Sequence, residues 1–295
     1  MKKLNKPIPT TGVVISGSKI GRTINYPTAN IKVKQSFTPK PGVYLSLSKV
    51  NSKSYLGLAY YGPQYINKKN ITNRLEVYLF DFNKDIYSKS IKIELTHYLR
   101  PPKKVKNING LKALIKKDFL KLQDYLVLTN KKDQIIGVEE ILKAHQNPPQ
   151  LHRATSVLIF NSKKELLLQK RSNQKPLWPR YWSNTCCGNK RPELSMKQFA
   201  QQRLQFEMGL KVDLKYFYKF TYKARYNKKL SEHEIDYVYL GVTDKKPTLN
   251  PKEAKDFQYI SIPDLKKDIK LNPKKYTPWL KLIMKKVTPS VILTS

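Results

Sequence analysis

The chain has 295 residues, of which 40% are hydrophobic and 11% aromatic, so it can bury the cores of two ordinary domains and is not disordered throughout. No apolar run reaches the length of a membrane span, and the basic start at Met1 is followed by no apolar segment typical of a secretory signal. The only cysteines, Cys186 and Cys187, are adjacent and cannot build a disulfide framework, which favours a reducing, cytoplasmic setting.

Lysine dominates the charge. The chain carries 57 basic and 21 acidic residues, a net charge of +36, and 48 of the basic residues are lysines. The excess is spread evenly, with 24 basic and 6 acidic residues up to residue 124 and 33 and 15 after it. Proteins that recognise nucleic acids rely on arginine. We therefore favour a compositional bias over a polyanion partner as the origin of the lysine excess, although nucleic-acid binding stays open. In either case the field attracts anionic substrates such as nucleotides and diphosphates.

Residues 1–108 predict a series of short strands. Apolar residues alternate with polar ones at 43–47 and 91–95, and turn signals at 39–42 and 61–63 separate such segments. Several short strands spaced by turns favour a small barrel or sandwich.

From Asn109 the apolar spacing becomes helical, with Asn109 as the expected N-cap. The residues on one helical face are Leu111, Leu114, Ile115 and Leu122. We expect this helix to end near Asp124, and we place the end of a first domain, residues 1–124, there.

Residues 125–288 mix both periods and form the expected second domain, with residues 289–295 as a tail. Ser195 and Gln198 have the spacing of a capping box, which predicts a helix through Met208 that Gly209 ends. Helices are also expected towards the C-terminus. Strands are expected at 126–129, 155–160, 165–170, 217–224 and 234–243.

A short basic loop, Gly17-Ser18-Lys19-Ile20-Gly21-Arg22, follows the first apolar strand. Its backbone N–H groups can cradle phosphates, with Lys19 and Arg22 adding charge, although two glycines in a turn are often only a turn. The hydroxyl of Thr28 and the amide oxygen of Asn30 suit a hard cation such as Mg²⁺.

Glu76 is the candidate base of the first part. Strand alternation places it on the same face as Tyr78, Phe80 and Phe82, where an aromatic environment would raise the pKa of its carboxyl group. The alternative is a carboxylate at the edge of a barrel that faces water.

The first part resembles the riboflavin kinase family over residues 11–124. The resemblance implies a six-stranded β-barrel with a C-terminal helix that phosphorylates riboflavin with ATP. It further implies that Thr28 and Asn30 bind MgATP and that Glu76 deprotonates the ribityl hydroxyl. The motifs that carry it are Gly21-Arg22, Tyr26-Pro27-Thr28-Ala29-Asn30-Ile31, Pro41-Gly42-Val43-Tyr44, Glu76-Val77, Phe80-Asp81-Phe82 and Tyr98-Leu99-Arg100-Pro101.

Two features depart from this family's pattern. Asn25 replaces a usual glycine, and asparagine tolerates a left-handed backbone nearly as well. Pro63-Gln64-Tyr65 replaces an Asn-Pro-Thr-like segment, which leaves the flavin or nucleotide contacts there open. The adenylyltransferase domain found upstream in many bacterial versions is absent, so we expect FMN and not FAD as the product.

The second part offers a candidate metal site and a candidate thiol. His145, His152, Glu232 and Glu234 combine imidazoles and carboxylates, which can bind Zn²⁺, Mn²⁺ or Mg²⁺. Strand alternation points the intervening His233 away from the two carboxylates.

Cys187 precedes Gly188, and such a cysteine is more often buried and inert than catalytic. Arg203 and Glu207 lie four residues apart on the expected helix, where an exposed ion pair is the simplest interpretation.

Taken in chain order, the motifs of the second part resemble type 1 isopentenyl-diphosphate isomerase over residues 126–285. This family is a member of the Nudix superfamily and has an α/β/α sandwich. The motifs are Leu151-His152-Arg153-Ala154-Thr155-Ser156, Gln169-Lys170-Arg171-Ser172, Trp178-Pro179, Trp182-Ser183-Asn184-Thr185-Cys186-Cys187-Gly188 and Ser231-Glu232-His233-Glu234-Ile235-Asp236.

The resemblance implies a role for each site residue of this part. Cys187 and Glu234 are the acid and the base that shift a double bond, with Tyr222 beside the base and Trp279 facing a transient carbocation. Glu207 holds Mg²⁺ on the diphosphate. The expected diphosphate contacts are Arg171, Lys175 and Arg203, and the expected metal ligands are His145, His152, Glu232 and Glu234.

One ligand departs from the isomerase pattern. The family has a histidine two residues after the catalytic cysteine, whereas this chain has Asn189. An amide oxygen can coordinate Mg²⁺ or Mn²⁺ but is a poorer ligand for Zn²⁺. We expect weaker metal affinity at this site, with activity retained.

These observations predict a bifunctional enzyme that makes FMN from riboflavin and ATP, and interconverts isopentenyl and dimethylallyl diphosphate. Two alternatives stay open. The charge and Asn189 favour a non-catalytic basic scaffold on RNA or a ribosome, built from decayed enzyme domains. The other alternative is a second domain that hydrolyses nucleotide diphosphates as a Nudix hydrolase, although residues 196–208 lack the Glu-Glu pair that such hydrolases use.

Overall fold

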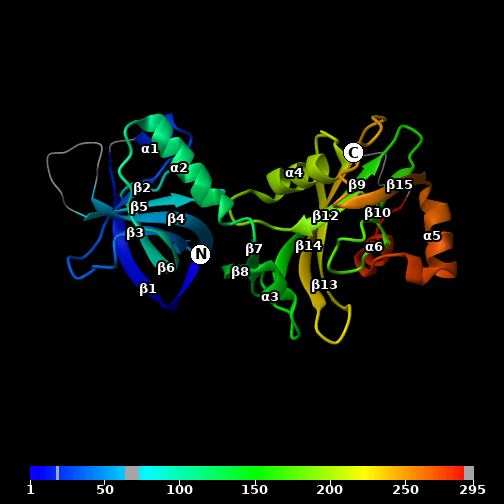
Figure 1. Cartoon of the computed structure of the whole chain (residues 1–295), viewed down its shortest axis with the longest axis horizontal. Coiled ribbons are helices and arrows are strands. Elements are labelled where there is room, and N and C mark those ends of the chain that lie inside the picture. The colour runs from blue at the N-terminus through cyan, green and yellow to red at the C-terminus, as the bar shows by residue number, and fades with distance from the viewer. Residues whose placement is uncertain (18–19, 64–72, 289–295) are drawn as a thin grey trace. The chain divides into compact units, whose positions relative to one another are not determined.

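The computed structural model describes residues 1–17, 20–63 and 73–288, which form two compact units (Figure 1). The first unit comprises Met1–Val138 with Arg191–Leu194, and the second comprises Glu139–Lys190 and the chain from Ser195 onward. The first unit thus extends past residue 124, the boundary expected from the sequence. Within the described ranges, every helix is too short or too polar to span a lipid bilayer.

Six antiparallel strands of the first unit close into a barrel, as the sequence predicts, in the order β1-β2-β5-β4-β3-β6. Alternation fills the interior: along β6, Ile91, Ile93 and Leu95 are buried while Lys92 and Glu94 are exposed. The strands are β1 (Lys2–Ile15), β2 (Ala29–Lys32), β3 (Gly42–Val50), β4 (Lys53–Pro63), β5 (Asn73–Leu79) and β6 (Ser90–Arg100).

Helix α2 (Ile108–Leu120) follows the barrel, and the short α1 (Ile20–Thr23) lies between β1 and β2. The predicted N-cap, Asn109, is wrong by two residues. Asn107 has the extended backbone that a cap requires, and its side chain accepts a hydrogen bond from the N–H of Gly110 at 3.0 Å. The unit also contains β7 (Tyr125–Thr129) and most of β8 (Ile135–Glu140).

The second unit is built on a mixed sheet with the strand order β11-β10-β9-β14-β13, with β12 paired to β9 and β15 to β10. Strands β9 and β14 run parallel, and the other pairs are antiparallel. The strands are β9 (His152–Phe160), β10 (Leu166–Arg171), β11 (Trp182–Ser183), β12 (Cys186–Asn189), β13 (Lys215–Arg225), β14 (Ser231–Val242) and β15 (Ala254–Ile260).

Helices cover both faces of this sheet (Figure 1). Val157 and Ile159 of β9 pack against α4 (Met196–Met208), whereas Leu158 and Phe160 face the side covered by α5 (Ile262–Leu271) and α6 (Pro278–Ile283). The three layers confirm the predicted α/β/α sandwich. The remaining short helices are α3 (Ile141–His145) and η1 (Pro273–Lys275).

Helix α4 begins and ends as predicted. Ser195 accepts a hydrogen bond from the N–H of Gln198, and the Gln198 side chain accepts one from the N–H of Ser195, which completes the capping box. Gly209 has a φ of 68°, the left-handed conformation that ends helices. This helix carries Arg203 and Glu207 into the second unit's site.

Candidate active sites

In the barrel, strand pairing brings Glu76 beside Thr28 and Asn30. Asn30 on β2 lies directly opposite Glu76 on β5, and Thr28 immediately precedes β2. The Thr28 hydroxyl donates to Oε2 of Glu76 over 3.3 Å. A hydroxyl, an amide and a carboxylate from segments far apart in sequence are thus gathered at one end of two paired strands.

Both glycines of the basic loop lie against these residues. A β-carbon on Gly17 would stand 2.0 Å from the amide nitrogen of Asn30, and one on Gly21 would stand 2.3 Å from the carbonyl oxygen of Tyr26 and 3.1 Å from the backbone nitrogen of Thr28. The loop therefore needs glycine for close approach. Lys19 lies outside the described residues. Asn25 has a φ of 64°, as expected for a residue in a glycine position.

A cavity of about 190 Å³ opens beside Glu76, and Tyr26, Thr28 and Tyr78 also line it. Burial raises the pKa of the Glu76 carboxyl above its ordinary value, against the opposing effects of the Thr28 hydrogen bond and the Arg74 charge. Glu76 is therefore half-buried beside aromatic rings and does not simply face water.

The expectation that Phe82 shares this face is wrong. Tyr78 and Phe80 pack on one hydrophobic cluster, whereas Phe82 packs on the other, with Val77. Strand β5 ends before the turn at Asp81, whose φ of 52° breaks the alternation.

Arg22 lines a second cavity, of about 330 Å³, and Thr28 lines both. The Arg22 guanidinium donates to the hydroxyl of Tyr87 over 3.2 Å, and its carbon lies 5.8 Å from the centre of the Tyr87 ring. Thr28 is therefore reached from both cavities, each of which is lined by aromatic and by basic side chains. Gln64 and Tyr65, for which the sequence left ligand contacts open, lie outside the described residues.

In the second unit, His145, His152, Glu232 and Glu234 form one buried cluster whose ligand atoms all lie within 4.8 Å of one another. Strand β14 supplies both carboxylates, and Glu234 pairs with His152 across the parallel strands β14 and β9. His233 is not part of this cluster, which agrees with strand alternation.

Hydrogen bonds to backbone carbonyls orient the two histidine rings of this cluster. Nδ1 of His145 lies 2.6 Å from the carbonyl oxygen of Ile141, and Nδ1 of His152 lies 2.8 Å from that of Gln150. A carbonyl only accepts, so each Nδ1 carries a proton, and each Nε2, the atom that a metal ion would bind, faces the cluster.

Both Nε2 atoms face carboxylates. Nε2 of His145 is 2.8 Å from Oε2 of Glu232, and Nε2 of His152 is 3.5 Å from Oε1 of Glu234 and has no hydrogen-bond partner. Carboxylates buried together need positive charge beside them, which a protonated His145 or a bound cation supplies. A divalent metal ion fits this donor set.

Asn189 belongs to the same neighbourhood. Its amide nitrogen lies 3.5 Å from Nε2 of His145, so rotation of the amide would turn its oxygen towards the cluster. Burial lowers the pKa of His145, but the hydrogen bond and the charge of Glu232 outweigh that effect and raise it to about 9. The carboxylates therefore favour positive charge at this position.

Alternation along β12 sends the two cysteines to opposite faces. Cys186 packs with the α4 side, whereas Cys187 contacts the cluster that contains Tyr222 and Trp279. Burial raises the pKa of the Cys187 thiol to about 12, the Arg171 charge opposes this, and the negative charge of Glu234 adds to it. Cys187 is thus a protonated thiol on the face of the sheet that holds Glu234.

Glu234 and Trp279 are held by specific hydrogen bonds. The Tyr222 hydroxyl donates to Oε2 of Glu234 over 2.6 Å. The indole N–H of Trp279 donates to Oγ of Ser183 and to Oδ1 of Asn184, both at 3.0 Å. These bonds fix the Glu234 carboxylate and the Trp279 indole plane, and they give Ser183 and Asn184 a role as acceptors for the indole N–H.

Arg171 is buried beside this site. Its guanidinium donates to the carbonyl oxygens of Leu177 and Trp178 and lies 3.6 Å from Sγ of Cys187. Its carbon also lies 5.2 Å from the centre of a Trp279 ring. Arg171 therefore links the thiol to the Trp279 ring and to the backbone of Leu177 and Trp178.

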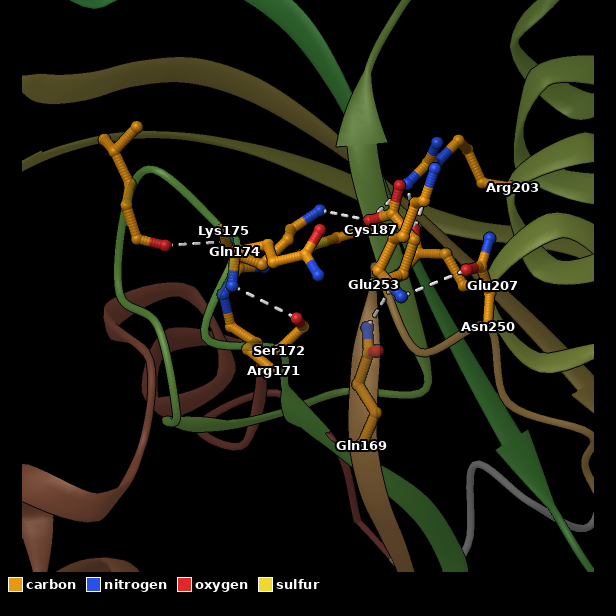
Figure 2. A network of polar contacts seen from close by, with 12 residues as sticks. Gln169, Arg171, Ser172, Gln174, Lys175, Cys187, Arg203, Glu207, Asn250 and Glu253 are labelled. Atoms are coloured by element: carbon orange, nitrogen blue, oxygen red, sulfur yellow. Dashed lines mark hydrogen bonds and ion pairs between the residues drawn. The ribbon is translucent and has the colours of Figure 1, made fainter.

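Lys175, Arg203 and Glu207 belong to one buried network (Figure 2). Arg203 donates through Nη2 to Oε1 of Glu207 at 2.7 Å, and Gln169 donates to Oε2 of Glu207 at 2.8 Å. Because Glu207 is fully buried, the simple picture of an exposed ion pair is wrong. Glu207 is not part of the histidine cluster.

Two carboxylates here were not foreseen from the sequence. Glu253 accepts hydrogen bonds from Lys175 at 2.5 Å and from Arg203 at 3.1 Å, and the pairing of β15 with β10 brings it there.

The second unforeseen carboxylate is Asp236, which continues the face of Glu232 and Glu234 and accepts a hydrogen bond from Ser156 at 2.7 Å. Burial raises the pKa of Asp236 well above its ordinary value. The every-second-residue spacing from Glu232 was the available signal for Asp236.

Comparison with known proteins separates the two units. Residues 4–126 match the riboflavin kinase family and residues 150–280 the NUDIX domain. The chain is 36% identical over 166 residues to isopentenyl-diphosphate Delta-isomerase 2 of Aromatoleum aromaticum, covering 56% of this chain and 87% of that protein. It is 38% identical over 162 residues to the isopentenyl-diphosphate Delta-isomerase of Pectobacterium atrosepticum, covering 55% and 90%. The chain therefore carries a riboflavin kinase domain and belongs, through its second part, to the isopentenyl-diphosphate isomerase family of Nudix proteins.

Proposed function

We propose that the chain is a bifunctional enzyme that phosphorylates riboflavin with ATP and isomerises isopentenyl diphosphate to dimethylallyl diphosphate. For the barrel, the contact of half-buried Glu76 with Thr28, opposite Asn30, supports this proposal most directly. For the second unit, the protonated Cys187 thiol on the face of Glu234 does so. Neither family match favours the scaffold or the hydrolase alternative.

In the kinase reaction, Glu76 takes the proton of the ribityl hydroxyl while that oxygen attacks the terminal phosphorus of ATP, and ADP leaves with the electrons of the broken P–O bond. The raised pKa of Glu76 makes it a stronger base. The cavity with Tyr26 and Tyr78 suits an aromatic ring system, and the cavity with Arg22 suits phosphates.

Thr28 and Asn30 would hold Mg²⁺ through a hydroxyl and an amide oxygen, which are ligand types that this ion accepts. When bound, the ion neutralises phosphate charge. Gly17 and Gly21 keep the loop close to these two side chains, since a β-carbon at either position would clash with them or with the adjoining backbone.

In the isomerase reaction, the Cys187 thiol gives its proton to the terminal carbon of the alkene, and Glu234 removes a proton from the carbon on the other side of the branched centre. The double bond moves by one position. Between the two transfers the branched carbon is cationic, and the indole of Trp279 offers it a negative π face. Tyr222 holds the Glu234 carboxylate through its 2.6 Å hydrogen bond.

His145, His152, Glu232 and Glu234 would hold a divalent metal ion, with the Asn189 oxygen as a further donor. When bound, the ion neutralises the buried carboxylates. Two imidazoles with three oxygen donors favour Mn²⁺ or Mg²⁺ over Zn²⁺. Lys175 and Arg203 would bind the diphosphate, and Glu207 would hold Mg²⁺ on it.

The test gives the purified chain riboflavin, ATP and Mg²⁺ in one assay, and isopentenyl diphosphate with Mn²⁺ or Mg²⁺ in another. We expect FMN and dimethylallyl diphosphate. Glu76→Gln should abolish FMN formation and leave isomerisation unchanged, whereas Cys187→Ala should do the reverse, so each variant is the folding control for the other. Salt-sensitive RNA binding with neither product would instead support a scaffold.

A further inference from the structure

A groove of about 710 Å³ lies in the second unit, lined by residues of β13, α5 and α6 and outside the histidine cluster. Its floor is apolar, with Ile269 from α5 and with Leu282 and Met284 from α6 and the following turn. Tyr222 and Ala224 of β13 close one side. A groove of this size exceeds what a five-carbon chain fills and suits a longer apolar ligand.

Five lysines surround this floor. Lys266 and Lys281 are half-buried, and the other three are exposed, so several ammonium groups share one apolar surface. Among the described residues that line the groove there is no carboxylate to balance them. The lysines are Lys223, Lys266, Lys270, Lys281 and Lys285.

Lysine stems commonly cover apolar surface while their charged ends reach water. Here, however, lysines from β13, from α5, and from α6 and the turn after it border one open groove, and their like charges repel one another. The Lys281 ammonium also donates to the carbonyl oxygen of Pro273 over 3.3 Å. An anion with an apolar chain would relieve that repulsion and cover the floor at the same time. Neither a free phosphate nor a neutral lipid does both.

The groove also shares a wall with the proposed isomerase site. The Tyr222 ring lines the groove while its hydroxyl donates to Glu234, and Pro278, which lines the groove, directly precedes Trp279. A ligand seated here would contact the supports of the base and of the indole without reaching the thiol.

We propose that this groove binds a soluble prenyl diphosphate with a chain longer than five carbons, its chain on the apolar floor and its diphosphate among the lysines. Such binding requires neither enzymatic activity, so its failure is distinguishable from a failure of the proposed function.

Calorimetric titration of the full-length chain with farnesyl diphosphate tests the proposal. Lys270→Glu/Lys285→Glu reverses two charges at the groove and should weaken binding by roughly tenfold. Lys267→Glu/Lys286→Glu makes the same change at exposed neighbours that do not line the groove, and should stay within about twofold of the parent. Equal weakening by both pairs would assign the effect to overall charge and overturn the proposal.

Two further arms examine the ligand. Farnesol and inorganic pyrophosphate should each bind more weakly than farnesyl diphosphate, because each lacks one half of the contact. Leu282→Glu should weaken farnesyl diphosphate more than pyrophosphate, since it places a charge on the floor. If the groove variants bind farnesyl diphosphate like the parent, the ligand occupies another site and the groove is not the receptor.

Discussion

Asn189 places a single amide beside two imidazoles and two carboxylates, 3.5 Å from Nε2 of His145. Replacing it with histidine adds a third imidazole to the cluster. We expect Asn189→His to raise Zn²⁺ affinity by about tenfold or more and to raise isomerase activity at limiting metal. Competition with a chromophoric chelator measures the affinity.

Asn189→Ala is the matched control, because it removes the amide and adds no donor. It should bind metal more weakly than the parent chain. If the histidine and alanine variants bind metal equally, residue 189 does not reach the ion and the site is built from the other four residues.

Glu253, which the sequence analysis did not identify, belongs to the network with Lys175 and Arg203 (Figure 2). Burial would raise the pKa of its carboxyl, but Arg203 and Lys175 outweigh burial and lower it below 4.5. A carboxylate whose pKa is lower in the folded state stabilises the fold above its unfolded pKa, and this stability is lost as the pH falls through the folded pKa.

Glu253→Gln should therefore reduce the free energy of unfolding at pH 7 by about 1–3 kcal/mol, since it removes the negative charge from two charge-assisted hydrogen bonds. The difference from the parent chain should shrink below pH 4.5. Urea unfolding across this range measures it. A difference that does not change with pH would mean that Glu253 contributes through packing instead of charge.

At the scale of elements, α2 is attached to the barrel by one buried ion pair. Arg100 of β6 donates to Asp118 of α2 through Nε and Nη2, both at 2.8 Å, and both residues line the cavity beside Glu76. Asp118→Asn leaves the Arg100 charge without its partner. We expect it to destabilise the first unit by about 3 kcal/mol and to weaken riboflavin binding.

Thermal unfolding and quenching of riboflavin fluorescence measure these two effects. Asp124→Asn removes an exposed carboxylate near the end of the same helix and should change neither. Normal riboflavin affinity in a destabilised Asp118→Asn chain would show that the position of α2 does not shape the cavity.

The elements also show what local sequence can predict. The bounds of α4 were predicted to the residue, because a capping box and a left-handed glycine act through neighbouring backbone groups. The N-cap of α2 was misplaced, because Asn107 and Asn109 both suit the position and the backbone geometry decides between them. Glu253 could not be found, since its partners arrive through the pairing of β15 with β10 and through α4.

The motifs of the two families indicated the site residues more directly than periodicity did. Alternation alone correctly separated Glu232 and Glu234 from His233, but it could not bring in His145, which lies on α3. Alternation also placed Phe82 on the same face as Glu76, which is wrong, because the pattern does not predict the turn at Asp81 that ends the strand.

At the scale of the whole molecule, a net charge of +36 should act on substrates according to their own charge. Isopentenyl diphosphate is a small polyanion, and its encounter with a strongly positive protein is accelerated at low salt. Riboflavin is neutral, so its encounter is not. We propose that one chain acts on both substrates, so the salt dependence of one reaction can be compared directly with that of the other.

We therefore expect kcat/KM for isopentenyl diphosphate to fall by roughly tenfold between 0.01 and 0.15 M salt, as the Debye length shortens from about 30 to about 8 Å. With ATP saturating, kcat/KM for riboflavin should stay nearly constant over the same range. An equal decline for both substrates would point to a general effect of salt on the fold. A constant value for both would mean that the lysine excess exerts no field on its substrates and reflects composition alone.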